Sequence, residues 1–239
     1  MKILVTICAR GGSKGIPGKN IKVINGKPLI WYTIQTAKQF QQVVEEVDIV
    51  LSTDSEEIIK VAAECGLQSD YKRPDYLAND TCGKIDAIKD AVLHYEKQYG
   101  KKYDYVLDMD VTSPLRNVDD LLAALDYFQN VKGAVNLYSV SPASRNPYFN
   151  MVEQKPNGFY NLVKDDVLSL SRQTAPVVYE QNASFYIYRR EFFDLGYKSS
   201  DTDRSTIYLV PHICFDLDNP LDFEIMSYLL ENNKLDFKL

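Results

Sequence analysis

Short apolar runs alternate with helical patterns along this chain, and that alternation limits the fold more than any other feature. The run KILVTICA (2–9) is continuously apolar and ends at glycines, which is typical of a strand buried on both faces of a parallel sheet. The runs VDIVLSTD (47–54) and YDYVLDMDV (103–111) also predict strands. Strands that alternate with helices indicate an α/β fold with a parallel sheet and right-handed crossovers.

Helical patterns occupy the spaces between these strands. Apolar residues recur at helical spacing behind Pro28, a residue that favours the first turn of a helix. Ser55 is a good N-cap ahead of two acidic residues, and Gly66 is a good C-cap for the same helix. The expected helices cover residues 28–40, 55–66, 86–100 and 219–233.

Residues 133–190 depart from this rhythm. They contain short, aromatic-rich segments that are broken by Pro and by Asn-Gly, a pattern that indicates β structure. We expect β segments or an arm here, outside the alternating βα units. The length of 239 residues fits one large domain, so we treat 1–239 as a single domain that contains this arm.

Composition excludes several classes of protein. The net charge of −6 argues against nucleic-acid binding, which needs a broad basic face. No segment approaches 18 consecutive apolar residues, and the apolar start is too short for a signal peptide, so neither a membrane span nor a leader is expected. The four cysteines form no CxxC motif and only two histidines are present, which disfavours zinc. These features together indicate a reduced, cytoplasmic protein.

The segment ICARGGSKGIPGKNIKVINGKPLI (7–30) is strongly cationic within an acidic chain. A glycine-rich turn between a strand and a helix lets backbone amides approach a phosphate closely, and lysines add charge. The segment matches neither the P-loop pattern nor the dinucleotide pattern GxGxxG. A local cluster of this kind favours a small anionic ligand, although a glycine turn with solvated lysines is the alternative.

The sequence of this segment resembles the signature of the CMP-sugar synthetases, the cytidylyltransferases that activate N-acylneuraminate and related acids. Further similar segments follow in order over nearly the whole length. The resemblance implies a Rossmann-like nucleotidyltransferase α/β sheet with a projecting dimerisation arm, and therefore a homodimer. The other similar segments are STDSEEI, KRPDYLAND, TSPLRNVDDL, SRNPYFNMVE, SRQTAPVVYEQNASFYIY and FDLDNPLDFEI.

The reaction implied by the resemblance joins CTP to a nonulosonic acid, which gives a CMP-sugar and pyrophosphate. Arg10, Lys14 and Lys19 would meet the triphosphate, and each is otherwise a surface cation. Arg73 could instead form a surface ion pair, and Thr81 could be a helix cap. The residues that the resemblance places at the nucleotide are Arg10, Gly11, Gly12, Ser13, Lys14, Lys19, Asn20, Arg73 and Thr81.

A divalent metal site is indicated by Asp216 and Asp218. Residues i and i+2 on a strand end point to the same face, and Mg²⁺ takes one or two carboxylates together with phosphate oxygens. The resemblance also implies that the two are metal ligands. The alternative is a pair of helix-capping aspartates before Pro220.

Arginines are expected at the carboxylate of the sugar acid, because the guanidinium fork binds carboxylates through two hydrogen bonds. Arg145 and Arg172 are the candidates. The resemblance implies that the arm carries Arg172 to the neighbouring protomer's site, and the alternative is an exposed arm residue. Gln173 and Phe185 are expected to line the sugar pocket, although Phe185 could equally belong to the core. Arg116 is expected to anchor its own loop.

One position departs from the neuraminate enzymes. Asp110 stands where those enzymes typically have Gln, and this variant resembles the branch that activates legionaminic acid. A carboxylate can only accept hydrogen bonds, so Asp110 could bind Mg²⁺ or a sugar substituent, or be a buried strand-end residue held by backbone amides. The alternatives are a CMP-N-acetylneuraminate synthetase, a nicotinamide-linked oxidoreductase and an inactive sugar-nucleotide binder.

Overall fold

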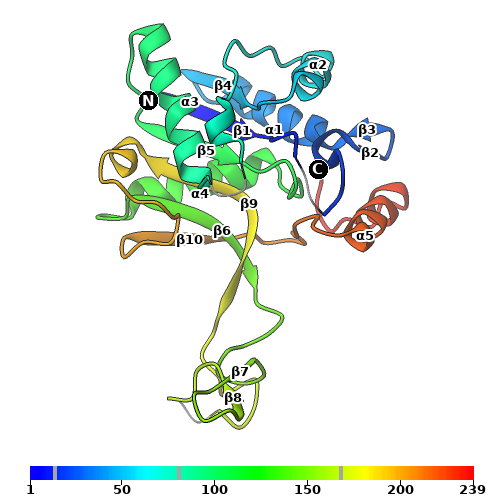
Figure 1. Cartoon of the computed structure of the whole chain (residues 1–239), viewed down its shortest axis with the longest axis vertical. Coiled ribbons are helices and arrows are strands. Elements are labelled where there is room, and N and C mark those ends of the chain that lie inside the picture. The colour runs from blue at the N-terminus through cyan, green and yellow to red at the C-terminus, as the bar shows by residue number, and fades with distance from the viewer. Residues whose placement is uncertain (13–14, 80–81, 167–168) are drawn as a thin grey trace.

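A six-stranded sheet forms the centre of the molecule in the computed structural model, which describes residues 1–12, 15–79, 82–166 and 169–239 (Figure 1). The strand order is β10-β6-β9-β5-β1-β4. β1 pairs in parallel with β4 and β5, as predicted, whereas β9 runs antiparallel between β5 and β6. The sheet is therefore mixed, because β9, from the region expected to lie outside the βα units, joins it in the antiparallel direction. The strands are β1 (Ile3–Cys8), β4 (Val47–Ser52), β5 (Tyr105–Met109), β6 (Asn136–Pro142), β9 (Tyr179–Arg189) and β10 (Ser205–Leu209).

The helices expected at 28–40, 55–66, 86–100 and 219–233 form close to those positions, whereas the helix at Val118–Asn130 was not predicted. Ser55 caps α2 by accepting a hydrogen bond from the Ile58 amide at 3.4 Å, and Gly66 follows that helix with a positive φ of 88°. In the described part of the chain, none of the helices has the length and apolar character needed to cross a membrane. The α-helices are α1 (Leu29–Val43), α2 (Glu56–Glu64), α3 (Lys84–Tyr99), α4 (Val118–Asn130) and α5 (Pro220–Glu231). Short elements are the hairpin β2 (Val23–Ile24) and β3 (Lys27–Pro28) and the 3₁₀ turns η1 (Lys19–Ile21), η2 (Asp75–Leu77) and η3 (Arg190–Phe193).

Helices cover both faces of the sheet. Along β1, Ile3, Val5 and Ile7 pack into the core that contains α1, α4 and α5, while Leu4 faces the core formed with α3 and η3. Successive residues of a strand point to opposite faces, so a strand buried on both sides must be continuously apolar. This arrangement explains the uninterrupted run that predicted β1.

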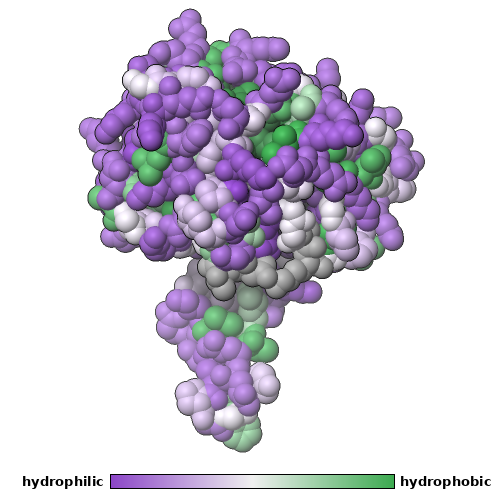
Figure 2. All heavy atoms as spheres, turned by 45° about the horizontal axis from the view of Figure 1, so that its top comes forward, coloured by the Kyte–Doolittle hydropathy of each residue, from purple (hydrophilic) through white to green (hydrophobic). Residues whose placement is uncertain are grey.

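The arm is shorter than the predicted region 133–190. β6 and β9 are members of the central sheet, and the chain between them projects from the body and carries the hairpin β7 (Val152–Gln154) and β8 (Tyr160–Leu162) (Figure 1). Hydrophobic side chains lie among the hydrophilic ones on the arm surface (Figure 2). The most exposed of these in the described part of the arm are Phe159, Tyr160, Leu170 and Val177.

The sheet order creates a crevice at the carboxyl ends of two neighbouring strands. The chain leaves β1 toward β4 on one side and returns past β1 to β5 on the other. Open α/β sheets bind ligands outside the carboxyl ends of strands at such a point, because the loops leave in opposite directions there. The residues that follow β1 and β5 therefore hold the candidate site.

Candidate functional site

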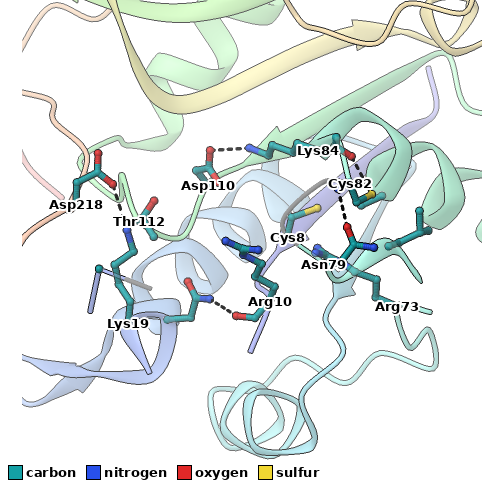
Figure 3. A pocket seen from close by; sticks show the side chains of 15 residues that line it. Cys8, Arg10, Lys19, Arg73, Asn79, Cys82, Lys84, Asp110, Thr112 and Asp218 are labelled. Carbon is teal, nitrogen blue, oxygen red and sulfur yellow. Dashed lines mark hydrogen bonds and ion pairs between the residues drawn. The ribbon is translucent and has the colours of Figure 1, made fainter. Parts of the chain in front are cut away.

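A cavity of about 600 Å³ lies at the carboxyl ends of β1 and β5 (Figure 3). Loop residues after β1 line one wall, and the segment that leads into α3 lines another. The cavity is lined mainly by polar and charged side chains, which suits a charged ligand. The lining residues are Cys8, Arg10, Gly15, Lys19, Asn20, Arg73, Leu77, Asn79, Cys82, Gly83, Lys84, Ala87, Asp110, Thr112 and Asp218.

The glycine-rich loop brings Arg10, Lys19 and Asn20 together in the lining of this cavity, and their contacts with a nucleotide stay a prediction. The Asn20 side chain is buried and donates to the Arg10 carbonyl at 3.0 Å, so it braces the loop that carries Arg10. A Cβ atom at Gly15 would lie 2.8 Å from the Asp218 carbonyl oxygen, too close for any larger residue. Gly15 is therefore required because the loop packs directly against the segment around Asp218.

The other residues of the glycine-rich loop that the structure describes are not all in the cavity lining. Gly11 and Gly12 are exposed, and the Gly11 amide donates to the Asp54 carboxylate at 2.9 Å. Asp54 follows β4, so it fixes the start of the glycine loop to the neighbouring strand. The predicted nucleotide contacts of Ser13, Lys14 and Thr81 lie outside the described residues.

Arg73 is a buried wall residue of the cavity. Its Nε donates to Ser52 Oγ at 3.0 Å and its Nη2 donates to the Ser52 carbonyl at 2.8 Å. These bonds to the end of β4 fix the plane of the guanidinium. The alternative of a surface ion pair is wrong, because the side chain is only 6% exposed.

Lys84 is a cavity residue that the sequence analysis missed. Its Nζ lies 2.6 Å from Asp110 Oδ2 and 2.7 Å from Asp108 Oδ2, and it stands over the Tyr186 ring. Thr6 donates to the other Asp108 oxygen at 2.6 Å. A lysine at the first position of a helix is electrostatically unfavourable, and this was the available signal for a special role.

Burial and charge together shift the titration of this cluster. Burial alone would lower the pKa of Lys84, but the Asp108 and Asp110 carboxylates raise it well above the ordinary value. Burial raises the pKa of Asp110, and the Lys84 charge opposes that shift. Burial raises the pKa of the Cys8 thiol to about 12, so the thiol stays protonated near neutral pH.

A buried polar network supports the loop behind Asp110. Arg116 is fully buried and donates to the carbonyls of Ser113, Ser184 and Asp110 at 2.6, 2.8 and 2.9 Å. Burial lowers the pKa of its guanidinium to about 10, which still leaves it charged near neutral pH. Arg116 anchors its own loop, as predicted, and also ties that loop to β9 through Ser184.

Asp216 and Asp218 lie in an irregular segment between β10 and α5, so the expectation of a strand end is wrong. The capping alternative is also wrong, because Asn219 is the N-cap of α5. The Asp218 side chain is 74% exposed, with Oδ1 3.4 Å from Lys19 Nζ. The segment is held beside the loop after β5 by the bond from the Leu217 amide to the Thr112 carbonyl at 2.8 Å.

The donor chemistry of these carboxylates fits a divalent cation. Asp216 Oδ1 is buried and has no hydrogen-bond partner among the described residues, and its charge acts on Asp110. A buried acceptor without a donor is costly unless a further group satisfies it. Within the described ranges, no three His, Cys, Asp or Glu side chains form a complete metal cluster, but Mg²⁺ bound to phosphates needs only one or two carboxylates.

Of the predicted sugar-binding residues, Asp110 lines this cavity, whereas Arg145, Arg172, Gln173 and Phe185 do not. Arg145, Arg172 and Gln173 are exposed on the arm, which projects away from the body of its own chain (Figure 1). Phe185 is fully buried in the core and its ring lies 5.9 Å from the Tyr208 ring. The expectation that Phe185 lines a sugar pocket is therefore corrected: it faces the core because alternate residues of β9 point to opposite faces.

Solved structures show which fold this chain shares. A CMP-2-keto-3-deoxy-manno-octonic acid synthetase in complex with CTP aligns with a TM-score of 0.67 at 16% identity, covering 98% of this chain and 100% of that one. A 4-diphosphocytidyl-2C-methyl-D-erythritol synthase from Anaerococcus prevotii aligns with a TM-score of 0.64 at 12% identity, covering 96% and 98%. The fold is therefore that of the nucleotidyltransferases.

Sequence comparison narrows this class. Residues 4–236 match the family model described as cytidylyltransferase, and the chain belongs to that family. The post-translational flagellin modification protein B of Campylobacter coli is 38% identical over 99% of this chain and 98% of that protein. The CMP-N,N'-diacetyllegionaminic acid synthase of Campylobacter jejuni is 36% identical, covering 98% and 97%. These matches exclude the nicotinamide-linked oxidoreductase alternative.

Proposed function

We propose that this enzyme transfers the cytidylyl group of CTP to a nonulosonic acid of the legionaminic type. The similarity to CMP-N,N'-diacetyllegionaminic acid synthases, which extends over essentially the whole chain, is the observation that carries the proposal. Asp110 in the cavity wall, at the position where the neuraminate enzymes typically have Gln, supports the legionaminic substrate. A CMP-N-acetylneuraminate synthetase remains the second candidate, because N-acylneuraminate cytidylyltransferases of Streptococcus agalactiae are 30–31% identical over 93% of this chain.

The cavity supports nucleotidyl transfer through charge and position. The anomeric hydroxyl of the acid attacks the α-phosphorus while the bond from that phosphorus to the bridging oxygen breaks, and pyrophosphate leaves. Such a step needs neutralised phosphate charge and an in-line approach more than covalent help from the protein. Arg10 and Lys19 would meet the phosphates at the glycine loop, and Arg73 would hold the base end of the nucleotide.

A divalent cation, Mg²⁺, is part of this proposal. Asp216 and Asp218, with Asp110 nearby, would hold it, and the bound cation would neutralise phosphate oxygens during transfer. The unpartnered Asp216 oxygen supports this assignment. The Lys19–Asp218 contact keeps the glycine loop next to these carboxylates, so phosphates bound by the loop would lie beside the cation.

A homodimer with composite sites completes the proposal. The exposed apolar side chains of the arm would be covered by a second copy, and Arg145, Arg172 and Gln173 would reach the partner's sugar site. In this arrangement each cavity receives its carboxylate-binding arginine from the other chain. The cytoplasmic location and the absence of nucleic-acid and membrane partners expected from the sequence stay predictions.

Pyrophosphate release with CTP and a panel of nonulosonic acids tests the proposal. We expect the highest kcat/KM with N,N'-diacetyllegionaminic acid, lower values with N-acetylneuraminate, and no turnover with ATP, GTP or UTP. EDTA should abolish the reaction and Mg²⁺ should restore it. A preference for N-acetylneuraminate would favour the second candidate, and equal rates with ATP would contradict the nucleotide assignment.

A further inference from the structure

Lys84 bridges two carboxylates in the cavity wall. Its ammonium contacts Asp110 at 2.6 Å and Asp108 at 2.7 Å, and the centroid of the Tyr186 ring lies 4.6 Å away. Figure 3 shows the Lys84 side chain directed at Asp110 from the start of α3. The ammonium is thus a counter-ion to groups of the protein itself, and we call the three charged residues Lys84, Asp108 and Asp110 the Lys84 bridge.

The two carboxylates of the Lys84 bridge differ in their freedom to move. Asp108 is fully buried, and Thr6 holds its second oxygen at 2.6 Å. The Asp110 side chain is 21% exposed and lines the cavity. Asp108 is therefore a permanent partner of Lys84, whereas Asp110 can turn toward a ligand in the cavity.

Stability of the fold does not account for a lysine at this position. Lys84 is the first residue of α3, where the helix dipole disfavours a cation. The ion pairs of Lys84, whose side chain is 34% exposed, are also weak evidence for stability, because apolar replacements of such pairs are often neutral or stabilising. The position at the cavity wall instead points to a role in ligand binding.

We propose that Lys84 is a positioning residue that occupies the cation-facing side of Asp110 in the free enzyme, and that Asp110 exchanges Lys84 for a divalent cation when CTP binds. This inference rests on the proposed function of the cavity. After the exchange Lys84 keeps Asp108 and the Tyr186 ring, so its charge remains paired. The free cation alone competes poorly with Lys84, and the enzyme therefore takes up cation and nucleotide together.

Direct binding of Mn²⁺ to the enzyme without nucleotide tests this exchange. Lys84→Met removes the competing charge while keeping similar bulk, and electron paramagnetic resonance reports free and bound Mn²⁺. We expect Lys84→Met to bind Mn²⁺ at least about tenfold more tightly than wild type does. Such a gain corresponds to only a small part of the interaction energy between two unit charges at this distance. The double variant with Asp110→Asn should lose that gain.

Two control variants separate this effect from a change in net charge or folding. Lys84→Arg keeps the charge and should bind Mn²⁺ as wild type does. Lys89→Met removes another lysine of α3, whose Nζ donates to the Phe193 carbonyl at 2.8 Å, and should also leave Mn²⁺ binding unchanged. Mn²⁺ affinity in Lys84→Met equal to that of wild type would overturn the proposal.

If Lys84→Met does not fold, a measurement on the wild-type protein tests whether Asp110 exchanges Lys84 for the cation. The side-chain ammonium signal of Lys84 can be followed by ¹⁵N nuclear magnetic resonance and assigned through Lys84→Arg. We expect no change with Mg²⁺ alone and a clear shift with Mg²⁺ and CTP together. A shift with Mg²⁺ alone, or an unchanged signal in a CTP-saturated enzyme, would contradict the exchange. Failure to bind CTP would instead overturn the proposed function, and the Mn²⁺ titration, which needs no nucleotide, would still decide the role of Lys84.

Discussion

Two arginine side chains are buried around the cavity at the carboxyl ends of β1 and β5, whereas the arginines of the arm are exposed. Around the cavity, Arg73 and Arg116 are buried and their guanidinium groups donate to backbone carbonyls at the ends of strands and loops. On the arm, Arg145 and Arg172 are exposed, and so are apolar residues such as Leu170. The body therefore holds these guanidinium groups in fixed positions, whereas the described arm leaves its arginines and several apolar side chains exposed to solvent in the single chain.

The largest difference between the two regions should appear in stability. Arg116→Met leaves several buried carbonyls without donors, and we expect a loss of about 3 kcal/mol or more in the free energy of unfolding. The same change at Arg172 should alter that free energy by no more than about 0.5 kcal/mol, since the side chain is exposed. Urea unfolding at equal protein concentration measures both, and similar losses would break the comparison.

Catalysis should depend on the carboxylates of the body without a matching cost in stability. Asp216→Asn and Asp218→Asn each remove a charged group that would hold the cation, and we expect kcat to fall by about 10²-fold. Melting temperatures measured without metal should stay near the wild-type value or rise, because close carboxylates repel one another. Near-normal turnover at saturating Mg²⁺ would assign the substituted carboxylate to a structural role.

Substitutions on the arm should change the kinetic constants for the sugar acid and not those for CTP. Arg172→Ala removes a charge-assisted contact to the substrate carboxylate, so kcat/KM for the acid should fall by about tenfold or more while the KM for CTP stays nearly unchanged. Steady-state kinetics with each substrate varied in turn measures this. An equal effect on CTP would place Arg172 in the nucleotide site.

Mixed dimers sharpen the same prediction. After subunit exchange between Arg172→Ala and Asp218→Asn proteins, each mixed dimer would contain one site with both defects and one with neither. Activity should therefore return in part. A confirmed mixed dimer without activity would rule out composite sites.

The smallest expected effect is a change in the pH dependence of the free energy of unfolding, and it concerns His212 in the body of the molecule. Its Nε2 lies 2.9 Å from Asp120 Oδ2, and its ring stacks on Phe237. Burial by itself would lower the pKa of His212, but the hydrogen bond to Asp120 and the charges of Asp120 and Asp236 raise it above the ordinary 6.5. The folded state therefore favours the protonated form.

Stability from this pair should be fully present below the unfolded pKa of His212 and should be lost as pH rises through the folded pKa. Urea unfolding between about pH 6 and pH 8 should show this decline in the wild type. His212→Asn should remove that part of the pH dependence of the free energy of unfolding. A free energy of unfolding that rises with pH in the wild type only would contradict the assignment.

Much of the fold was predictable because burial leaves a pattern in the sequence. A strand covered on both faces must be continuously apolar, which identified β1, and Ser55 and Gly66 marked the ends of α2. Strand direction leaves no comparable signal. β9 also packs on both faces, but its antiparallel position between β5 and β6 depends on long-range pairing that no local pattern records.

The candidate site was predictable to the extent that its residues form local motifs. Arg10 and Lys19 belong to one glycine-rich loop, and Arg73 stands in a recognisable segment. Lys84 was missed because it lies at the start of α3 and pairs with Asp110, which directly follows β5 and is distant in the sequence. The rule that residues i and i+2 point to the same face holds for strands. It did not apply to Asp216 and Asp218, because their segment is irregular.

The place where the arm joins the body has a consequence for how such enzymes can diversify. Pro142 and Tyr179 are paired in the β6–β9 ladder, so the two ends of the arm are held side by side by the central sheet. An insertion between neighbouring ladder partners can be lengthened, shortened or exchanged for a related one while the register of the sheet is kept. If the proposed function holds, acceptor recognition and nucleotide binding could be inherited as separate modules, and chimeras joined at this ladder should fold with the cavity intact.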